Sequence, residues 1–238
     1  MNFENKNMLI IGGSSGIGLD LVQYLSAQRA NVFTASRSRS AFWPESIHYM
    51  EIDVLNSNAA LSSFLPDKLD GLVYCVGSIN LKPFARLSES DFIDDFKLNV
   101  IGAVSCIQQS LNALKNSSSA SIVLISSVAA RTGLGFHASI SASKAAIEGL
   151  AVSLAAELCT SQIRVNVVAP SLTDTPLASK LLNTAEKMEA SAKRHPLGKY
   201  GTARDISAAI AFLLSDDSSW ITGQVIPVNG GIGNLKTL

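Results

Sequence analysis

The sequence predicts a doubly wound α/β fold, in which a parallel sheet of about seven strands carries helices on both faces. Short apolar runs alternate along the chain with stretches whose apolar residues recur at helical spacing. Strands separated by helices pair in parallel, because each connection crosses over the sheet. No Pro/Gly/Ser-rich linker interrupts the 238 residues, so we expect a single domain over 1–238.

The expected strands are short apolar runs, at residues 8–11, 31–35, 47–52, 72–76, 121–125, 165–169 and 225–228. The expected helices follow apolar residues at helical spacing, around residues 17–25, 96–111, 147–158 and 206–213. A sheet of this kind binds ligands at the carboxyl ends of its strands, near the point where the strand order reverses. A functional site is therefore expected at that edge.

Composition excludes several classes of function. The 19 basic and 19 acidic residues balance, so neither nucleic acid nor a membrane surface is an expected partner. The polar start MNFENKN does not resemble a targeting segment and no apolar run is long enough to span a bilayer, which favours a cytoplasmic protein. Cys75, Cys106 and Cys159 lie far apart without histidine partners, so we expect small buried residues and no metal site.

A glycine-rich turn follows the first expected strand, in IIGGSSGIGLDL. Glycine permits a tight turn, and bare N–H groups at a helix start can hold a pyrophosphate. The candidate phosphate-binding residues of this turn are Gly12, Ser14, Ser15, Gly16, Ile17 and Gly18. A simple strand-to-helix connection is the alternative, but the strand before the turn and the helix after it favour a nucleotide.

Further motifs extend along the chain: Asp53 in EIDV, Asn99 in KLNV, Ser126 and Ser127 in LISS, SASKAAIEGL, RVNVVAP and ITGQVIPVNGG. Together with GGSSGIG they resemble the short-chain dehydrogenase/reductase family, especially its 3-oxoacyl-carrier-protein reductases. The resemblance implies a Rossmann-type fold, a dinucleotide cofactor, a small carbonyl or alcohol substrate and a homodimer or homotetramer.

The end of the second expected strand favours NADP(H) over NAD(H). A carboxylate there would bind the ribose 2′-hydroxyl of NAD, whereas this chain has Ser36 and Arg37, with Arg39 nearby. Arg37 can bind a 2′-phosphate through a charge-assisted fork, although it could equally be an ordinary loop arginine. The other cofactor positions implied by the resemblance are Asp53 and Val54 at the adenine, and Gly77, Lys144, Pro170, Thr173 and Thr175.

The resemblance also implies a reaction centre of Asn, Ser, Tyr and Lys. Asn99, Ser127 and Lys144 match it, but Ile140 stands at the tyrosine position, four residues before the lysine. Isoleucine has no proton to exchange, and a general acid is worth about 10²–10⁴ in rate. We therefore expect the usual carbonyl reduction to be crippled unless another group substitutes.

Several groups are candidates for that role. His137 would lie on the same face as Ile140 if the helix begins early enough, and histidine suits proton transfer near neutral pH. Ser139 and Ser141 flank the position but are poor acids, and no spacing argument supports Tyr74 or Tyr200. Water acting with Lys144 is a further possibility. Residues 171–202 follow the sixth strand and are expected to form a substrate lid, or else an ordinary surface helix pair.

Three interpretations follow. The first is an NADP(H)-dependent oxidoreductase with an altered proton donor. The second is a non-catalytic dinucleotide-binding protein that acts as a regulator or as a subunit of a mixed oligomer. The third is a related reaction, such as double-bond reduction or epimerisation, that needs tyrosine less. Lys144, Ser127 and Asn99 favour the first, whereas Ile140 and the unusual segment from Tyr74 to Gly77 favour the second.

Overall fold

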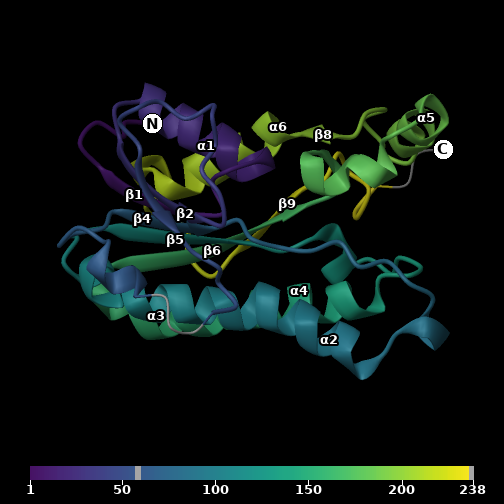
Figure 1. Cartoon of the computed structure of the whole chain (residues 1–238), viewed down its shortest axis with the longest axis horizontal. Helices are drawn as coiled ribbons and strands as arrows, with labels where there is room; N and C mark the ends of the chain where they lie inside the picture. Colours follow the sequence, from purple (N-terminus) through teal and green to yellow (C-terminus); the bar gives the residue numbers. More distant parts are fainter. Residues whose placement is uncertain (57–59, 236–238) are drawn as a thin grey trace.

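The computed structural model describes residues 1–56 and 60–235. Within these ranges, seven strands form one all-parallel sheet in the order β3-β2-β1-β4-β5-β6-β9, which confirms the predicted doubly wound fold (Figure 1). The strands are β1 (Asn7–Ile11), β2 (Asn31–Ser36), β3 (His48–Glu51), β4 (Gly71–Tyr74), β5 (Ala120–Ile125), β6 (Ile163–Pro170) and β9 (Val225–Val228). The strand order reverses direction at β1, so a crevice is expected beside its carboxyl end.

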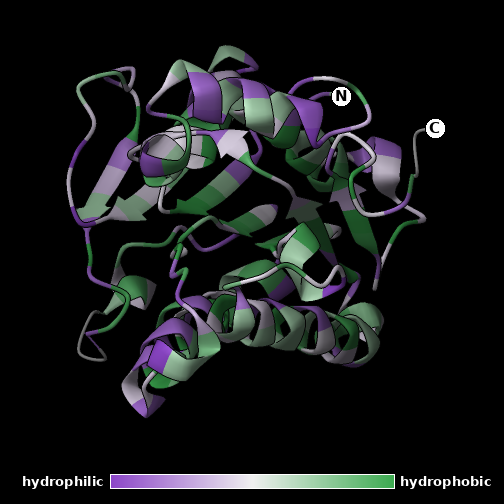
Figure 2. Cartoon of the chain, turned by 90° about the vertical axis from the view of Figure 1, so that its right-hand side faces the viewer, coloured by the Kyte–Doolittle hydropathy of each residue, from purple (hydrophilic) through white to green (hydrophobic). Residues whose placement is uncertain are grey.

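Helices cover both faces of the sheet (Figure 1). On one face lie α1 (Gly16–Ala27) and α6 (Ala203–Leu214), and on the other lie α2 (Glu89–Phe96), α3 (Gly102–Lys115) and α4 (Ala138–Leu158). Each layer has its own apolar core against the sheet, and Figure 2 shows the hydrophobic strands between the two helical layers. Of the helices described, none is long and apolar enough to cross a membrane.

The long helix predicted over 96–111 is interrupted. It consists of α2, a π-helical turn (Lys97–Ile101) and α3. The turn carries Asn99, and the buried Tyr74 hydroxyl donates to the carbonyl of Leu98 at 2.6 Å. Gly102 gives this hydroxyl room, because a Cβ there would collide with it. Helical spacing alone could not reveal the interruption, because a tertiary contact satisfies the backbone group concerned.

Residues 171–202 contain more structure than predicted. The two-residue strands β7 (Thr173–Asp174) and β8 (Gly201–Thr202) pair in parallel at the base of the segment, and a 3₁₀ turn spans Pro176–Leu181. The helix of this segment is α5 (Ala185–Lys193), and it begins there because the Thr184 hydroxyl accepts the N–H of Lys187 as its N-cap. The expected burial of all three cysteines is wrong for Cys159, which is exposed just after α4.

Candidate functional site

A cleft of about 350 Å³ lies at the carboxyl ends of β1, β2 and β4. Twelve of the predicted cofactor residues line it: Gly12, Ser14, Ser15, Gly16, Ile17, Gly18, Ser36, Arg37, Asp53, Val54, Gly77 and Thr175. Three do not, namely Lys144, Pro170 and Thr173. The sequence reasoning missed Cys75, Leu98 and Leu177, which also line the cleft. They come from the loop after β4, the π-helical turn and the 3₁₀ turn, which only the fold brings to this edge.

The glycine-rich turn is built for close approach to a ligand. Gly12 and Gly16 have φ angles of +87° and +54°, a region that side-chain-bearing residues rarely adopt. A Cβ on Gly12 would lie 2.9 Å from Cγ2 of Val76, so the turn also packs directly on the loop after β4. Ser15 precedes α1 as its N-cap, and its hydroxyl makes no capping hydrogen bond. The turn therefore presents bare backbone and a free hydroxyl to the cleft, which fits a dinucleotide pyrophosphate.

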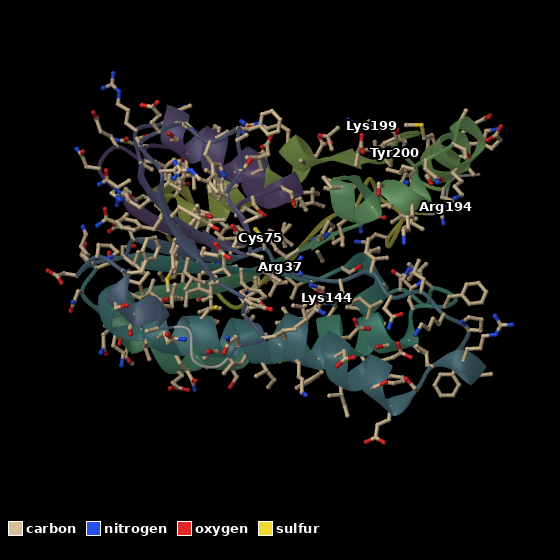
Figure 3. The ribbon with its side chains drawn as sticks, in the orientation of Figure 1. Arg37, Cys75, Lys144, Arg194, Lys199 and Tyr200 are labelled. Atoms are coloured by element: carbon tan, nitrogen blue, oxygen red, sulfur yellow. The ribbon has the colours of Figure 1, made fainter. Side chains whose placement is uncertain are left out.

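The end of β2 presents a positive charge to the same cleft. The Ser36 hydroxyl donates to the carbonyl of Ser38 at 2.9 Å and so shapes the loop. Arg37 is exposed and, within residues 1–56 and 60–235, forms no ion pair. In Figure 3 it lies near the centre of the molecule, in the region of Cys75. Asp53 lines the cleft from the loop after β3 and accepts the N–H of Leu55 at 3.1 Å.

Lys144 and Asn99 converge on Gly77 at the inner end of the cleft. A Cβ on Gly77 would lie 3.3 Å from Nζ of Lys144 and 3.2 Å from Oδ1 of Asn99. Lys144 is 7% exposed and donates to the carbonyl of Ile125 at 2.9 Å. Burial lowers its pKa from 10.5 to about 8, and the nearby Cys75 and Asp95 oppose this effect. Lys144 is thus a poorly solvated amine that lies against Gly77, which lines the cleft.

Asn99 is positioned by α2. Its Nδ2 donates to the carbonyl of Asp95 at 2.8 Å and to the hydroxyl of Ser78 at 3.1 Å. Its Oδ1 is buried and has no hydrogen-bond partner among the residues the structure describes. An acceptor without a partner in this position is suited to a water or ligand donor beside Lys144.

Ser127 lies just beyond β5, next to the end of β6. It is extended, and its hydroxyl accepts the N–H of Ala129 at 3.1 Å. Ile125 pairs with Val168, so continuing this parallel register places Ser127 opposite Pro170. Ile140 is buried on α4 one turn before Lys144, which places its side chain on the same face of the helix.

The groups considered as substitutes for tyrosine are held elsewhere. His137 precedes α4 as its N-cap, so the earlier helix start that its role required is wrong; its Nδ1 lies 2.6 Å from the carbonyl of Gly135. Ser141 donates to the carbonyl of Ala129 at 2.5 Å. The Tyr74 hydroxyl is committed to Leu98, and burial raises its pKa. Figure 3 shows Tyr200 on residues 171–202, far from Lys144.

Comparisons with known proteins agree with this geometry. Residues 12–233 match a family model described as enoyl-(acyl carrier protein) reductase. A tropinone reductase homologue of Arabidopsis thaliana is 33% identical over 97% of this chain and 94% of its own length. The 3-oxoacyl-[acyl-carrier-protein] reductase MabA of Mycobacterium avium is 32% identical over 97% of this chain and 91% of its own. The chain belongs to the short-chain dehydrogenase/reductase (SDR) family.

Solved SDR structures have the same fold. A short-chain type dehydrogenase/reductase from Mycobacterium ulcerans superposes with a TM-score of 0.90 at 28% identity, covering 98% of this chain and 91% of that one. A tyrosine-to-phenylalanine variant of ElxO with NADPH bound gives 0.88 at 27% identity, covering 96% and 98%. Membership of the SDR family makes the chain an NAD(P)(H)-dependent oxidoreductase by homology. Among the residues described, no cluster of His, Cys, Asp and Glu is suited to a metal.

A buried carboxylate beside this SDR site was missed from the sequence. Asp95 is 4% exposed and lies one helical turn before Asn99. It accepts hydrogen bonds from the hydroxyls of Ser78 at 2.6 Å and Ser139 at 2.5 Å. Ser139 is therefore committed to Asp95. Asp95 could have been found from its spacing, because an acidic residue four positions before Asn99 lies on the same side of a helix as Asn99.

A buried histidine at the other side of the site was missed as well. His195 follows α5 and is 4% exposed. Its Nε2 lies 2.8 Å from Oγ of Ser171, and its Nδ1 lies 2.7 Å from the carbonyl of Ser191. The sequence did offer one indication of an unusual polar contact here, because Ser171 follows Pro170 at a position where the SDR pattern usually has glycine.

Proposed function

We propose that this SDR protein is an NADP(H)-dependent oxidoreductase that interconverts a carbonyl and a hydroxyl group with a proton donor other than tyrosine. The observation that carries the proposal is the convergence of Lys144 and Asn99 on Gly77, with Ser127 at the end of the neighbouring strand β5. A buried lysine costs stability, so its position beside the cleft is best explained by a ligand that it holds.

The cofactor assignment is supported by the shape and charge of the cleft. The bare turn from Gly12 to Gly18 fits a pyrophosphate, and Arg37 without an ion-pair partner among the described residues fits a 2′-phosphate. When bound, the dinucleotide supplies or accepts a hydride. The chain's own residues would then hold the nicotinamide ribose through Lys144 and a substrate oxygen through the Ser127 hydroxyl.

A second candidate function is favoured by one observation. Ile140 is buried and apolar one turn before Lys144, where SDR enzymes carry tyrosine. A chain of this kind could bind the dinucleotide without turnover, as a regulator or as a subunit of a mixed oligomer. The ElxO structure supports only the binding step, because it contains NADPH in a variant that has lost a tyrosine hydroxyl.

One experiment distinguishes the two functions. NADPH oxidation is measured with β-keto thioesters, diketones and quinones, for the native protein and for Ile140→Tyr. Comparable rates mean that another group replaces tyrosine in the native protein. Turnover by Ile140→Tyr alone means that the native chain is a binder, provided that NADPH binds both proteins equally in a fluorescence titration.

The exposed surface of α2, the π-helical turn and α4 supports assembly into a homodimer or homotetramer. Its large apolar side chains include Ile93, Phe96, Ile101 and Val152, each between 42% and 52% exposed, and α2 packs against α4. An apolar face of this kind favours contact with a second copy. Sedimentation of the native protein and of Val152→Glu tests the assignment, since the charge should shift the protein toward monomer.

A further inference from the structure

We propose that Ser171 and His195 form a proton relay, in which the Ser171 hydroxyl exchanges a proton with the substrate oxygen in place of the missing tyrosine. The proposal rests on the oxidoreductase function above and names the group that completes it. Three features carry it: the hydrogen bonds of the pair, its place at the sheet edge and its burial.

The hydrogen bonds fix the direction of the relay. The carbonyl of Ser191 can only accept, so the proton of the neutral imidazole resides on Nδ1 of His195, 2.7 Å away. Nε2 is then an acceptor, and the Ser171 hydroxyl donates to it over 2.8 Å. A hydroxyl bonded to an imidazole whose other nitrogen is fixed by a third group is the arrangement that activates serine hydroxyls in enzymes.

The pair lies beside the predicted reaction centre. Ser171 directly follows Pro170, the last residue of β6, and the register of β5 and β6 places Ser127 opposite Pro170. Neighbouring strands are about 4.8 Å apart, so the two hydroxyl-bearing residues lie at adjacent strand ends. The relay requires the substrate oxygen to lie between these two strand ends, with Ser127 on one side and Ser171 on the other.

His195 is supplied by the segment that covers this edge. It follows α5, and a Cβ on Gly230 would lie 3.4 Å from its ring, so the C-terminal segment packs against the imidazole. At 4% exposure the ring is shielded from water, which preserves its bond to Ser171. Of the two side chains in the pair, only that of the half-buried Ser171 is accessible to a ligand.

The relay balances in the direction of reduction. A hydride adds to the carbonyl carbon, and the π-electron pair of the C=O bond moves onto the oxygen. Oγ of Ser171 gives its proton to that oxygen and takes one from Nε2 of protonated His195, which becomes neutral and regains its proton through the Ser171 hydroxyl once the product has left. Histidine suits this role because its side chain exchanges protons near neutral pH. Oxidation of the alcohol follows the same path in reverse.

The test compares His195→Gln and Ser171→Ala in two backgrounds, with the best carbonyl substrate of the panel above. In the native background each change should lower kcat at least ~100-fold, the size of a lost general acid. In the Ile140→Tyr background the new tyrosine supplies the proton, so the same changes should cost less than ~3-fold. The matched control is His48→Gln, because His48 is an exposed histidine on β3 that stacks on Phe33. This change should leave kcat unchanged in both backgrounds.

Two measurements do not depend on turnover. NADPH fluorescence titration should give the same Kd for the native protein, His195→Gln and Ser171→Ala within ~3-fold, because neither side chain lines the dinucleotide cleft. The ¹⁵N NMR signals of the neutral His195 ring should show a proton on Nδ1 and none on Nε2, and Ser171→Ala should shift Nε2 only.

The outcomes separate the two proposals. If the native protein turns over and His195→Gln does not slow it, or if the neutral His195 ring carries its proton on Nε2, the relay is wrong while the oxidoreductase function stands. If the native protein binds NADPH but only Ile140→Tyr turns over, both are wrong. Loss of rate in both backgrounds alike indicates a purely structural role for His195 and also overturns the relay.

Discussion

Replacing Lys144 with methionine should stabilise the protein. Burial lowers the Lys144 pKa from 10.5 to about 8, so at pH 7 the folded chain carries a charge that its surroundings disfavour. At about 1.4 kcal/mol for each pH unit, that displacement corresponds to about 3 kcal/mol of unfolding free energy. Methionine removes this cost and fits a similar volume, but leaves the Ile125 carbonyl without its 2.9 Å donor, which costs about 1–2 kcal/mol. The expected net gain is about 1–2 kcal/mol at pH 7.

The pH dependence is the sharper observable. Because the folded pKa lies below the unfolded one, the unfolded chain binds the extra proton between pH 8 and 10.5. The cost of the native lysine is therefore complete below pH 8 and fades as the pH rises toward 10.5. Urea unfolding of both proteins at pH 7 and pH 10 should show the advantage of Lys144→Met shrinking by about 2 kcal/mol. The exposed Lys115→Met is the control, and a Lys144→Met difference that is the same at both pH values would refute the reasoning.

Three further predictions concern the cleft and its support. Arg37→Asp should raise the Kd for NADPH at least ~10-fold and leave that for NADH unchanged or lower, as followed by fluorescence; an unaltered preference would remove Arg37 from the cofactor site. Gly102→Ala should destabilise the fold by about 1–3 kcal/mol in urea, because its Cβ meets the Tyr74 hydroxyl, and Tyr74→Phe should restore most of the loss. Gly18→Ala places a Cβ against the Gly12 carbonyl, so NADPH affinity and the thermal midpoint should fall together; loss of one alone would contradict the packing seen here.

The fold was predictable because its signals are local. Each buried strand is a short apolar run, and each crossover helix repeats apolar residues at helical spacing, so the strand and helix types follow without any tertiary information. Many residues that line the cleft were also predictable, since the turn from Gly12 to Gly18 is one continuous segment at the switch point of the sheet. Strand ends were less accurate: β4 ends at Tyr74, two residues before its predicted end.

The polar support of the site was not predictable in the same way. Asp95, the π-helical turn and His195 depend on partners 44, 24 and 24 positions away in sequence, namely Ser139, Tyr74 and Ser171. No helical or strand period relates such pairs, so a single sequence gives them no signal. Of the substitute donors that were considered, His137, Ser139 and Ser141 lay close to Ile140 in sequence, whereas the proposed pair of Ser171 and His195 lies more than 30 positions after it.

The stability lost by burying Lys144, Asp95 and His195 argues for a catalytic site. A buried lysine with a depressed pKa, a buried carboxylate at Asp95 and a buried histidine all lower the stability that an apolar core would give. A chain that only needed to fold and bind a dinucleotide could replace Asp95 and His195 with apolar residues and become more stable. Their arrangement around one sheet edge, on both sides of the predicted substrate position, is what a catalytic requirement would maintain. In the proposed function, Ile140 takes the place of one proton donor in a site whose other polar groups are present, and the pair of Ser171 and His195 would supply the proton.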